Sequence, residues 1–143
     1  MILLDTNVVC EAMRPKPDRN VLEWLDAQAA QTLYLSTVSL AELLLGIESL
    51  PAGKRRRALA AALAEQVIAL FAARIVPFDL PAAQSYSEIV MRARQSGHAI
   101  AVADAQIAAI AASRHFSVAT RDEAPFRAAG VEVLNPWKII PPA

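Results

Sequence analysis

The chain opens with Met1-Ile2-Leu3-Leu4-Asp5-Thr6-Asn7, in which a short apolar run leads directly into an acid. A fully apolar run of this length is typical of a strand buried on both faces, as in a parallel sheet. Asp5 then falls at the carboxyl end of the strand, where open parallel sheets bind their ligands. The alternative for Asp5 is to cap a helix beginning near Asn7, which is worth about 1 kcal/mol. This stretch therefore predicts a parallel α/β fold and a first candidate site residue.

Short apolar runs alternate with longer helical patterns along the rest of the chain. Further strands are predicted at residues 33–36, 74–78, 117–119 and 131–134. Helices are predicted at residues 20–29, 39–50, 54–71, 81–96, 103–115 and 123–129. Strands that alternate with helices indicate a parallel sheet covered on both faces. We therefore expect one α/β domain over residues 1–143, with a parallel sheet of about five strands and an irregular C-terminal strap at residues 135–142.

The composition is that of a globular domain outside the membrane. Hydrophobic residues make up 55% of the chain, enough for a sizeable core, yet no apolar run approaches the ~20 residues that a membrane span needs. The first residues carry neither a basic leader nor a small-residue cleavage site, so no signal peptide is expected. The lone cysteine, Cys10, excludes an internal disulfide and fits a reducing cytosol.

The charge balance narrows the class of protein further. Lysine and arginine total 14, aspartate and glutamate also total 14, and the net charge is zero. This balance argues against a plain nucleic-acid-binding module, which needs a basic excess, but not against an enzyme that cuts nucleic acid. The run Lys54-Arg55-Arg56-Arg57 is typical of a solvated helix face, with RNA contact as the alternative. Arg92, Arg94 and Arg121 are further candidates for phosphate contacts, and Trp137 is expected to pack.

Three more acids stand where acids are unusual. Glu42 lies in a strongly apolar helical run, so we expect it to face a polar cleft, with a solvent-facing glutamate as the alternative. Asp104 opens an alanine-rich helix and Asp122 follows the strand at residues 117–119, and for each the alternative is helix N-capping. Together with Asp5, these acids fall at strand ends or early in helices, positions that face one end of a parallel sheet.

A shared site for the four acids implies a hard divalent cation. Clustered carboxylates repel one another and are tolerated when Mg²⁺ or Mn²⁺ neutralises them. Zinc is not expected, because Cys10, His98 and His115 have no useful ligand spacing. An oxygen-ligand site suits phosphodiester hydrolysis by a metal-activated water. Four polar neighbours are expected either to orient the carboxylates and bound waters or to cap helices. These neighbours are Thr6, Asn7, Ser39 and Thr120.

Five motifs follow one another along the chain. They are Leu4-Asp5-Thr6-Asn7, Ser39-Leu-Ala-Glu42-Leu-Leu-Leu-Gly46, Ala103-Asp104-Ala-Gln-Ile-Ala, Ala119-Thr120-Arg121-Asp122, and Gly130-Val131 leading to Asn135-Pro136-Trp137. In this order they resemble the PIN domain, and above all the VapC toxins of bacterial type II toxin–antitoxin modules in their FitB-like branch. The resemblance runs the full length of the chain, and the ordered set is far more specific than any single motif.

This resemblance implies a PIN-like three-layer α/β/α sandwich and an Mg²⁺- or Mn²⁺-dependent endoribonuclease that acts as a toxin in the bacterial cytoplasm. It implies a homodimer or a larger toxin–antitoxin assembly. It also implies a cognate antitoxin whose C-terminal segment covers the acidic site, often with an inserted arginine. Asp5, Glu42 and Asp104 match the three main catalytic and metal-binding acids of the family, and Asp122 matches the more variable fourth.

One departure from the family pattern concerns the fourth acid. Many relatives read Thr-Arg-Asn followed three residues later by Asp-Phe, whereas here Asp122 replaces the asparagine and Pro125 precedes Phe126. Asp122 alone then supplies the auxiliary acid, and we expect its loss to be milder than the loss of Asp5 or Asp104.

Other functional classes remain as alternatives. A catalytically inactive protein of the same fold would only hold RNA or a partner, and the presence of all four acids disfavours it. A phosphotransferase with Asp5 as phospho-acceptor should carry a second acid two residues later, where Asn7 stands. A Ser-His-Asp hydrolase should show a nucleophile elbow, and this chain has none. A phosphate-binding glycine loop is also absent from the sequence.

Overall fold

Five short strands form one parallel sheet in the order β3-β2-β1-β4-β5 in the computed structural model, which describes residues 1–139. The strands are β1 (Ile2–Leu4), β2 (Leu33–Ser36), β3 (Ile75–Val76), β4 (Ser117–Ala119) and β5 (Val133–Leu134). The predicted parallel sheet of about five strands is confirmed. The predicted bounds of β1, β2 and β4 match those observed, whereas β3 and β5 are shorter than expected.

The register of the central strands decides where the acids go. Leu4 of β1 pairs with Leu35 of β2 on one side and with Ala119 of β4 on the other. The backbone N–H of Asp5 continues this ladder by donating to the Ala119 carbonyl at 2.9 Å. The strand order reverses at β1, with β2 and β3 to one side and β4 and β5 to the other. Such a reversal opens a crevice at the carboxyl ends of the strands, and Asp5 lies at that point.

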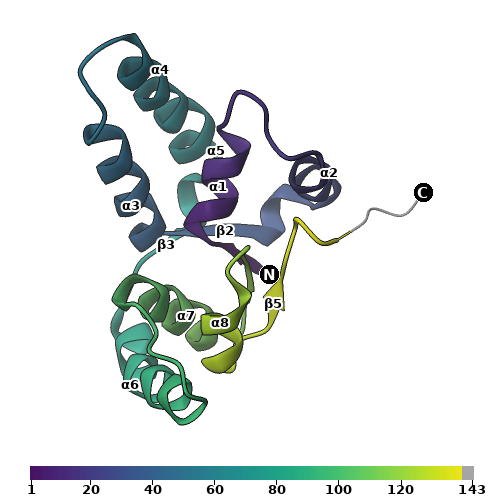
Figure 1. Ribbon diagram of the computed structural model, residues 1–143, viewed down its shortest axis with the longest axis vertical. Coiled ribbons are helices and arrows are strands. Elements are labelled where there is room, and N and C mark those ends of the chain that lie inside the picture. The colour runs from purple at the N-terminus through teal and green to yellow at the C-terminus, as the bar shows by residue number, and fades with distance from the viewer. Residues whose placement is uncertain (140–143) are drawn as a thin grey trace.

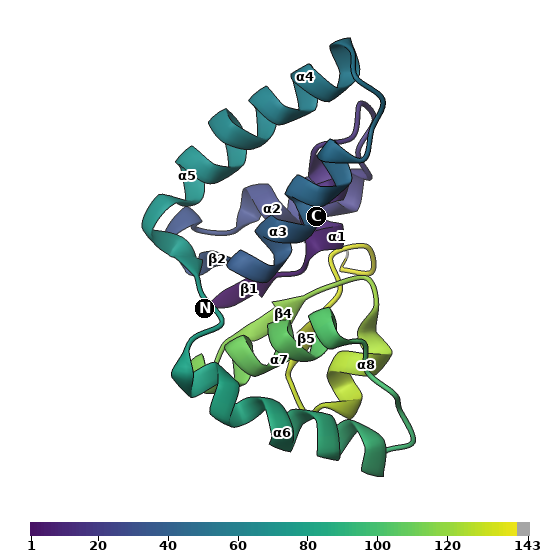
Figure 2. The same ribbon diagram turned by 90° about the vertical axis from the view of Figure 1, so that its left-hand side faces the viewer.

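Helices cover both faces of the sheet. They are α1 (Thr6–Ala12), α2 (Arg19–Ala27), α3 (Thr37–Glu48), α4 (Lys54–Ala62), α5 (Ala69–Phe71), α6 (Leu80–Gln95), α7 (Val102–Arg114) and α8 (Glu123–Ala128). Leu3 packs into a core with α6, α7 and α8, whereas Leu4 packs into a second core with α1, α2 and α3. Figures 1 and 2 show these two groups of helices on opposite sides of the sheet. The predicted three-layer α/β/α sandwich is therefore confirmed, and it follows from the alternation of side chains along each strand.

Side-chain caps fix several of the helix starts. Ser36 accepts a hydrogen bond from the backbone N–H of Ser39 at 2.9 Å and so begins α3. Asp79 accepts from the N–H of Ala82 at 3.1 Å and begins α6. Each of these helices begins within two residues of its predicted start because the capping residue is local in the sequence.

The predicted single helix at residues 54–71 is interrupted. α4 passes into a π-helical segment, η2 (Leu63–Ile68), before α5. Leu63, Val67 and Phe71 are all buried in the same core, at a spacing of four residues. A strict α-helix would rotate such a row steadily away from the core, and the wider turns of a π-helix bring it back. Packing of this row against the sheet therefore overrides the simple helical pattern.

The C-terminal strap lies partly within the described residues. From Asn135 to Ile139 it runs past α8 and the start of α2, where Asn20 donates a hydrogen bond to the Trp137 carbonyl at 3.0 Å. The rest of the predicted strap, residues 140–142, lies outside the described residues. No helix within residues 1–139 is long and apolar enough to cross a membrane.

Candidate active site

The four predicted acids line a single pocket of about 420 Å³ at the carboxyl edge of the sheet. They arrive there from separate elements: Asp5 follows β1, Glu42 lies in α3, Asp104 in α7, and Asp122 directly before α8. A fifth carboxylate, Glu11 of α1, also lines this acidic pocket. The remaining lining residues are Thr6, Asn7, Cys10, Arg14, Arg121 and Trp137.

The helix-capping alternatives for the acids have different outcomes. Asp5 does cap α1, because its Oδ1 accepts from the Thr6 N–H at 2.8 Å. Asp104 is not a cap: Ala101 holds that position, and Asp104 lies within the first turn of α7. Asp122 holds the N-cap position of α8, yet its side chain accepts no capping hydrogen bond. The carboxylates of Asp104 and Asp122 therefore have no role as helix caps.

The Thr120 hydroxyl connects Asp5 to its surroundings. It donates to Asp5 Oδ2 at 2.8 Å and accepts from the backbone N–H of Asp122 at 3.0 Å and from Asn7 Nδ2 at 3.3 Å. Thr120 is fully buried, and one donor with two acceptor positions is all that a hydroxyl offers. Together with the Thr6 N–H, Thr120 therefore holds both oxygens of Asp5.

A second hydroxyl performs the same task for Glu42. Thr6 Oγ1 lies 2.8 Å from Glu42 Oε1 and 3.0 Å from Ser39 Oγ. A hydroxyl has one proton and a carboxylate only accepts, so Thr6 donates to Glu42 and accepts from Ser39. Ser39 is fully buried and gives Thr6 a fixed anchor. The polar neighbours singled out in the sequence thus all bond to the acids or to one another.

Burial and mutual repulsion shape the electrostatics of the acidic pocket. Asp5 is only 5% exposed, and burial raises its pKa to about 6, against the lowering effect of the hydrogen bonds from Thr120 and Thr6. Repulsion from Asp104 and Glu42 raises it further. The pKa of Asp104 is also raised, first by burial and then by the charges of Asp122 and Glu42. These carboxylates are therefore close enough to affect one another, and within residues 1–139 none of Asp5, Glu42, Asp104 and Asp122 forms an ion pair.

The donor set of the acidic pocket fits a hard cation. It consists of carboxylate and hydroxyl oxygens, with Cys10 as the only soft donor among the described lining residues. No group of three or more histidine, cysteine, aspartate or glutamate side chains within residues 1–139 is gathered tightly enough to bind a metal on its own. Mg²⁺ usually keeps several waters and takes only one or two protein carboxylates directly, so its binding does not require such a group.

Sequence reasoning missed Glu11 and its partner Arg14. Glu11 is 5% exposed and accepts from Arg14 Nη1 at 3.2 Å through each of its oxygens. A signal was present in the sequence, since an arginine three residues after a glutamate at a helix end can form an ion pair; here Glu11 lies in the last turn of α1 and Arg14 just beyond it. Of the predicted phosphate-binding arginines, Arg121 lines the acidic pocket, whereas Arg92 pairs with Glu88 on α6.

A larger apolar groove of about 610 Å³ adjoins the acidic pocket. It lies between α1, α3 and α4, and Leu43, Ile47 and Leu59 contribute to its surface. Cys10, Arg14 and Glu42 line both cavities, so the groove leads directly to the acids. The predicted basic run at the start of α4 stands beside the groove through Arg55, not at the acids.

Fold and pocket together define a class: a parallel α/β protein with an acidic, oxygen-donor site at the strand-order reversal of its sheet. Within that class, the chain belongs to the PIN domain family, whose model matches residues 2–131.

Relatives of known sequence and structure agree with this assignment. The chain is 49% identical to the VapC ribonuclease Y4jK of Sinorhizobium fredii and 47% identical to the toxin FitB of Neisseria gonorrhoeae, in each case over 96% of this chain and 99% of the relative. It superposes on the crystal structure of FitAcB from Neisseria gonorrhoeae with a TM-score of 0.92 and 46% identity, covering 97% of this chain and 100% of the other. The predicted resemblance to FitB-like VapC proteins is confirmed.

Proposed function

We propose that this protein is a divalent-metal-dependent endoribonuclease that acts as the toxin of a bacterial toxin–antitoxin pair in the cytoplasm. The observation that carries the proposal is the convergence of Asp5, Glu42, Asp104 and Asp122 on one pocket. Among its described lining residues, Arg14 and Arg121 are the only basic ones. The relative named as a VapC ribonuclease supports the ribonuclease activity, and the relative named as the toxin FitB supports the role as a toxin.

The residues of the acidic pocket divide the work in this proposal. Asp5 and Asp104, with Glu42 and Asp122 beside them, would hold Mg²⁺ or Mn²⁺. Bound there, such an ion supplies Lewis-acid activation of water and stabilises charge on the phosphate. Thr120 and Thr6 keep the Asp5 carboxylate in one orientation, and Thr6 does the same for Glu42. Fixed carboxylates need no reorganisation when the ion or the substrate arrives.

The decisive test is cleavage of single-stranded RNA by the purified full-length chain. We expect cleavage with Mg²⁺ or Mn²⁺, none with EDTA, and none from Asp5→Asn. The matched control is Asp26→Asn, the same change at an exposed aspartate of α2 outside the acidic pocket, which should cleave like wild type. If the wild-type chain cuts no RNA with either metal, the enzyme proposal is wrong and the inactive binding protein becomes the better hypothesis.

A cognate antitoxin is the proposed partner, and the apolar groove is its proposed binding site. Solved relatives include FitAB bound to a DNA fragment, 44% identical to this chain with a TM-score of 0.93, and VapBC-5 of Mycobacterium tuberculosis, described as a member of the VapBC family of toxin–antitoxin systems. An apolar peptide segment lying in the groove would end at Glu42 and so reach the acidic pocket. Occupying the groove would thereby block access to the acids.

A substitution at Gly46 tests this binding site without disturbing the fold. A side chain at Gly46 would project into open space, because apart from its chain neighbours and the nearby backbone of α3 no atom lies within 4 Å of the point that its Cβ would occupy. Gly46 also lines the groove. Gly46→Met should therefore abolish co-purification with the antitoxin encoded next to the gene while RNA cleavage persists. Ala61→Met, at an exposed α4 position outside the groove, is the control. An unchanged complex with Gly46→Met would place the antitoxin elsewhere.

A homodimer is proposed as well. Leu45 of α3 is 68% exposed and Val102 of α7 is 64% exposed, and these helices pack against each other. Exposed large apolar side chains are typical of surfaces that another protein covers. Light scattering of the isolated chain should give twice the monomer mass of 15.4 kDa, and Leu45→Glu should give the monomer. A monomeric wild-type chain would contradict this proposal.

A further inference from the structure

The acidic pocket contains two arginines that differ in how they are held. Arg14 is committed to Glu11, whose two oxygens both accept from its Nη1. Arg121 instead lies with its guanidinium carbon 5.3 Å from the centre of the Trp137 ring. Within residues 1–139 no carboxylate forms an ion pair with Arg121. Its N–H groups are therefore available to an anion from outside the chain.

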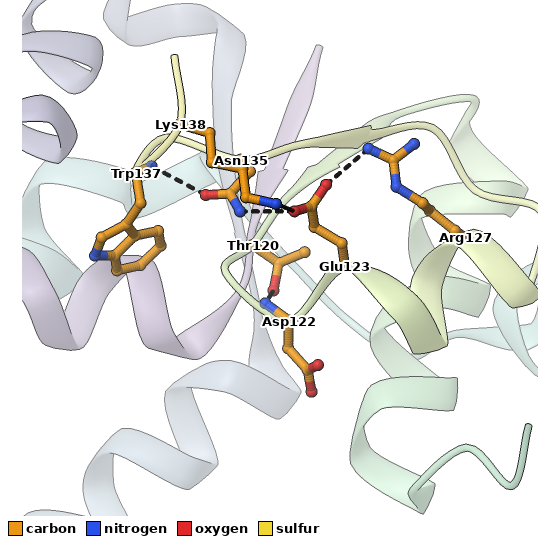
Figure 3. A network of polar contacts seen from close by, with 7 residues as sticks. All are labelled: Thr120, Asp122, Glu123, Arg127, Asn135, Trp137 and Lys138. Atoms are coloured by element: carbon orange, nitrogen blue, oxygen red, sulfur yellow. Dashed lines mark hydrogen bonds and ion pairs between the residues drawn. The ribbon is translucent and has the colours of Figure 1, made fainter. Parts of the chain in front are cut away.

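A group of bonds holds the Trp137 platform in place. Glu123 Oε2 accepts from Asn135 Nδ2 at 2.9 Å and from Lys138 Nζ at 2.6 Å, and we name Glu123, Asn135 and Lys138 the strap latch. Asn135 Oδ1 in turn accepts from the Trp137 N–H at 3.0 Å. Figure 3 shows the latch joining α8 to the strap, with Asp122 pointing to the opposite side. Arg127 Nη2 donates to the other oxygen of Glu123, Oε1, at 2.8 Å, so both oxygens of this carboxylate are held.

The backbone of Arg121 is fixed at the edge of the acids. Its N–H donates to Asn7 Oδ1 at 3.4 Å, and it stands between Thr120, which bonds to Asp5, and Asp122. A guanidinium supported on an aromatic face keeps its edge free for hydrogen bonds. Arg121 is therefore a preorganised cation beside the carboxylates. Its backbone is held by Asn7 and its guanidinium by the Trp137 ring.

An RNA strand needs such a cation here. Five carboxylates line the pocket, namely Asp5, Glu11, Glu42, Asp104 and Asp122, against the two arginines. One divalent ion leaves this set with a net negative charge, and a polyanionic strand is repelled by it. The planar fork of an arginine matches a phosphate through paired hydrogen bonds.

We propose that Arg121, stacked on Trp137 and steadied by the strap latch, binds a phosphate of the RNA strand adjacent to the one that is cleaved. This inference rests on the proposed ribonuclease function and names a substrate-binding position for it. Glu123 and Asn135 are positioning residues, because they act on the strand only through Trp137 and Arg121. A phosphate held there fixes the register of the strand over the acids.

The test compares Arg121→Ala and Arg121→Lys with the control Arg19→Ala, an exposed arginine that pairs with Glu23 on α2. Binding of a fluorescent single-stranded RNA is measured in an Asp5→Asn background, over a range of salt concentrations. Arg121→Ala should weaken binding roughly tenfold, as expected for a lost charged hydrogen bond. It should also reduce the slope of log K against log salt by about 0.7, as for one lost phosphate contact. Arg121→Lys should retain the slope, and Arg19→Ala should match the parent.

Kinetics with Asp5 intact separate positioning from catalysis. A contact to a non-reacting phosphate forms equally in the ground and transition states, so Arg121→Ala should raise KM and leave kcat nearly unchanged. Glu123→Gln should raise KM in the same direction by a smaller factor. Glu123 bonds to the buried Asn135, so the folding of Glu123→Gln is checked by its circular dichroism spectrum before KM is compared.

The outcomes distinguish this inference from the function on which it rests. If wild type cleaves RNA but Arg121→Ala binds it with unchanged affinity and salt slope, the inference is wrong and the ribonuclease stands. If Arg121→Ala weakens only the antitoxin complex, Arg121 contacts the protein partner and the inference is equally wrong. If wild type cleaves no RNA, the proposed function fails first.

Discussion

Asp122 and Glu123 are neighbours in the chain, yet they belong to opposite electrostatic environments. Asp122 faces the acidic pocket, where it raises the pKa of Asp104. Glu123 faces the strap, where Lys138 and Arg127 hold its pKa at about 2. Within residues 1–139 the pocket thus gathers four carboxylates, those of Asp5, Glu42, Asp104 and Asp122, that form no ion pair, whereas both oxygens of Glu123 are bonded in or beside the latch. Buried or clustered carboxylates without a counter-charge are typical of functional sites, where a bound cation supplies the missing charge.

The largest expected effect comes from removing charge in the pocket. Asp5→Asn and Asp104→Asn should each lower the rate of metal-dependent RNA cleavage by at least about a hundredfold, because metal ions contribute several kcal/mol to such reactions. Asp122→Asn should cost less, since Asp122 is exposed and, within residues 1–139, is held through its backbone N–H and not through its side chain. A loss in Asp122→Asn equal to that in Asp104→Asn would overturn this ranking.

The same change at Asp5 should improve stability. Raising the pKa of a carboxyl from 3.8 to about 6 corresponds to a penalty of about 3 kcal/mol once it is ionised. Because native Asp5 holds its proton more tightly than the unfolded chain does, stability falls as pH rises from about 4 to about 6. In EDTA at pH 7.5, Asp5→Asn should therefore raise the free energy of unfolding in urea by up to about 3 kcal/mol. The gain should vanish below pH 4, and a gain independent of pH would contradict the burial argument.

Thr120→Val tests whether RNA cleavage depends on the orientation of the Asp5 carboxylate as well as on its charge. This change keeps the side-chain volume and removes the hydroxyl that bonds to Asp5, Asn7 and the Asp122 N–H. Residues that orient metal-binding carboxylates typically account for about 10- to 100-fold in activity. We expect cleavage to fall within that range and metal affinity, measured by calorimetry, to fall with it. Thr120→Ser restores the hydroxyl and should recover most of both.

The smallest effect should come from the latch. Its stabilisation is present above the ordinary pKa of Glu123 and is lost as pH falls toward about 2. Glu123→Gln should therefore be slightly less stable than wild type at pH 7, and the two should converge as pH approaches 2. Thermal unfolding followed by tryptophan fluorescence measures the difference. A difference that grows on acidification would show that Glu123 is not held as an anion.

Short-range sequence patterns were enough to predict most of the fold and the positions of the acids. The strands β1, β2 and β4 lie where their apolar runs predicted them, because a strand buried on both faces must be apolar throughout. Asp5 follows β1 directly and Asp122 follows β4 after two residues, so their place at one edge of the sheet follows from the parallel topology. The π-helical segment η2 was not predicted, since its cause is the packing of Leu63 and Val67 against the sheet.

The sequence by itself determined a parallel α/β fold with acids at the carboxyl ends of its strands. Apolar runs, helix caps and strand ends each depend on residues that are adjacent in the chain, so they can be recognised without the tertiary structure. Only the tertiary structure decided which acids stay without counter-charges. Arg121 reaches Trp137, and Lys138 reaches Glu123, across 16 and 15 residues of chain respectively. Contacts over such separations depend on how whole helices and strands pack. They distinguish the pocket acids, which can bind a metal ion, from Glu123, which bonds to the C-terminal strap.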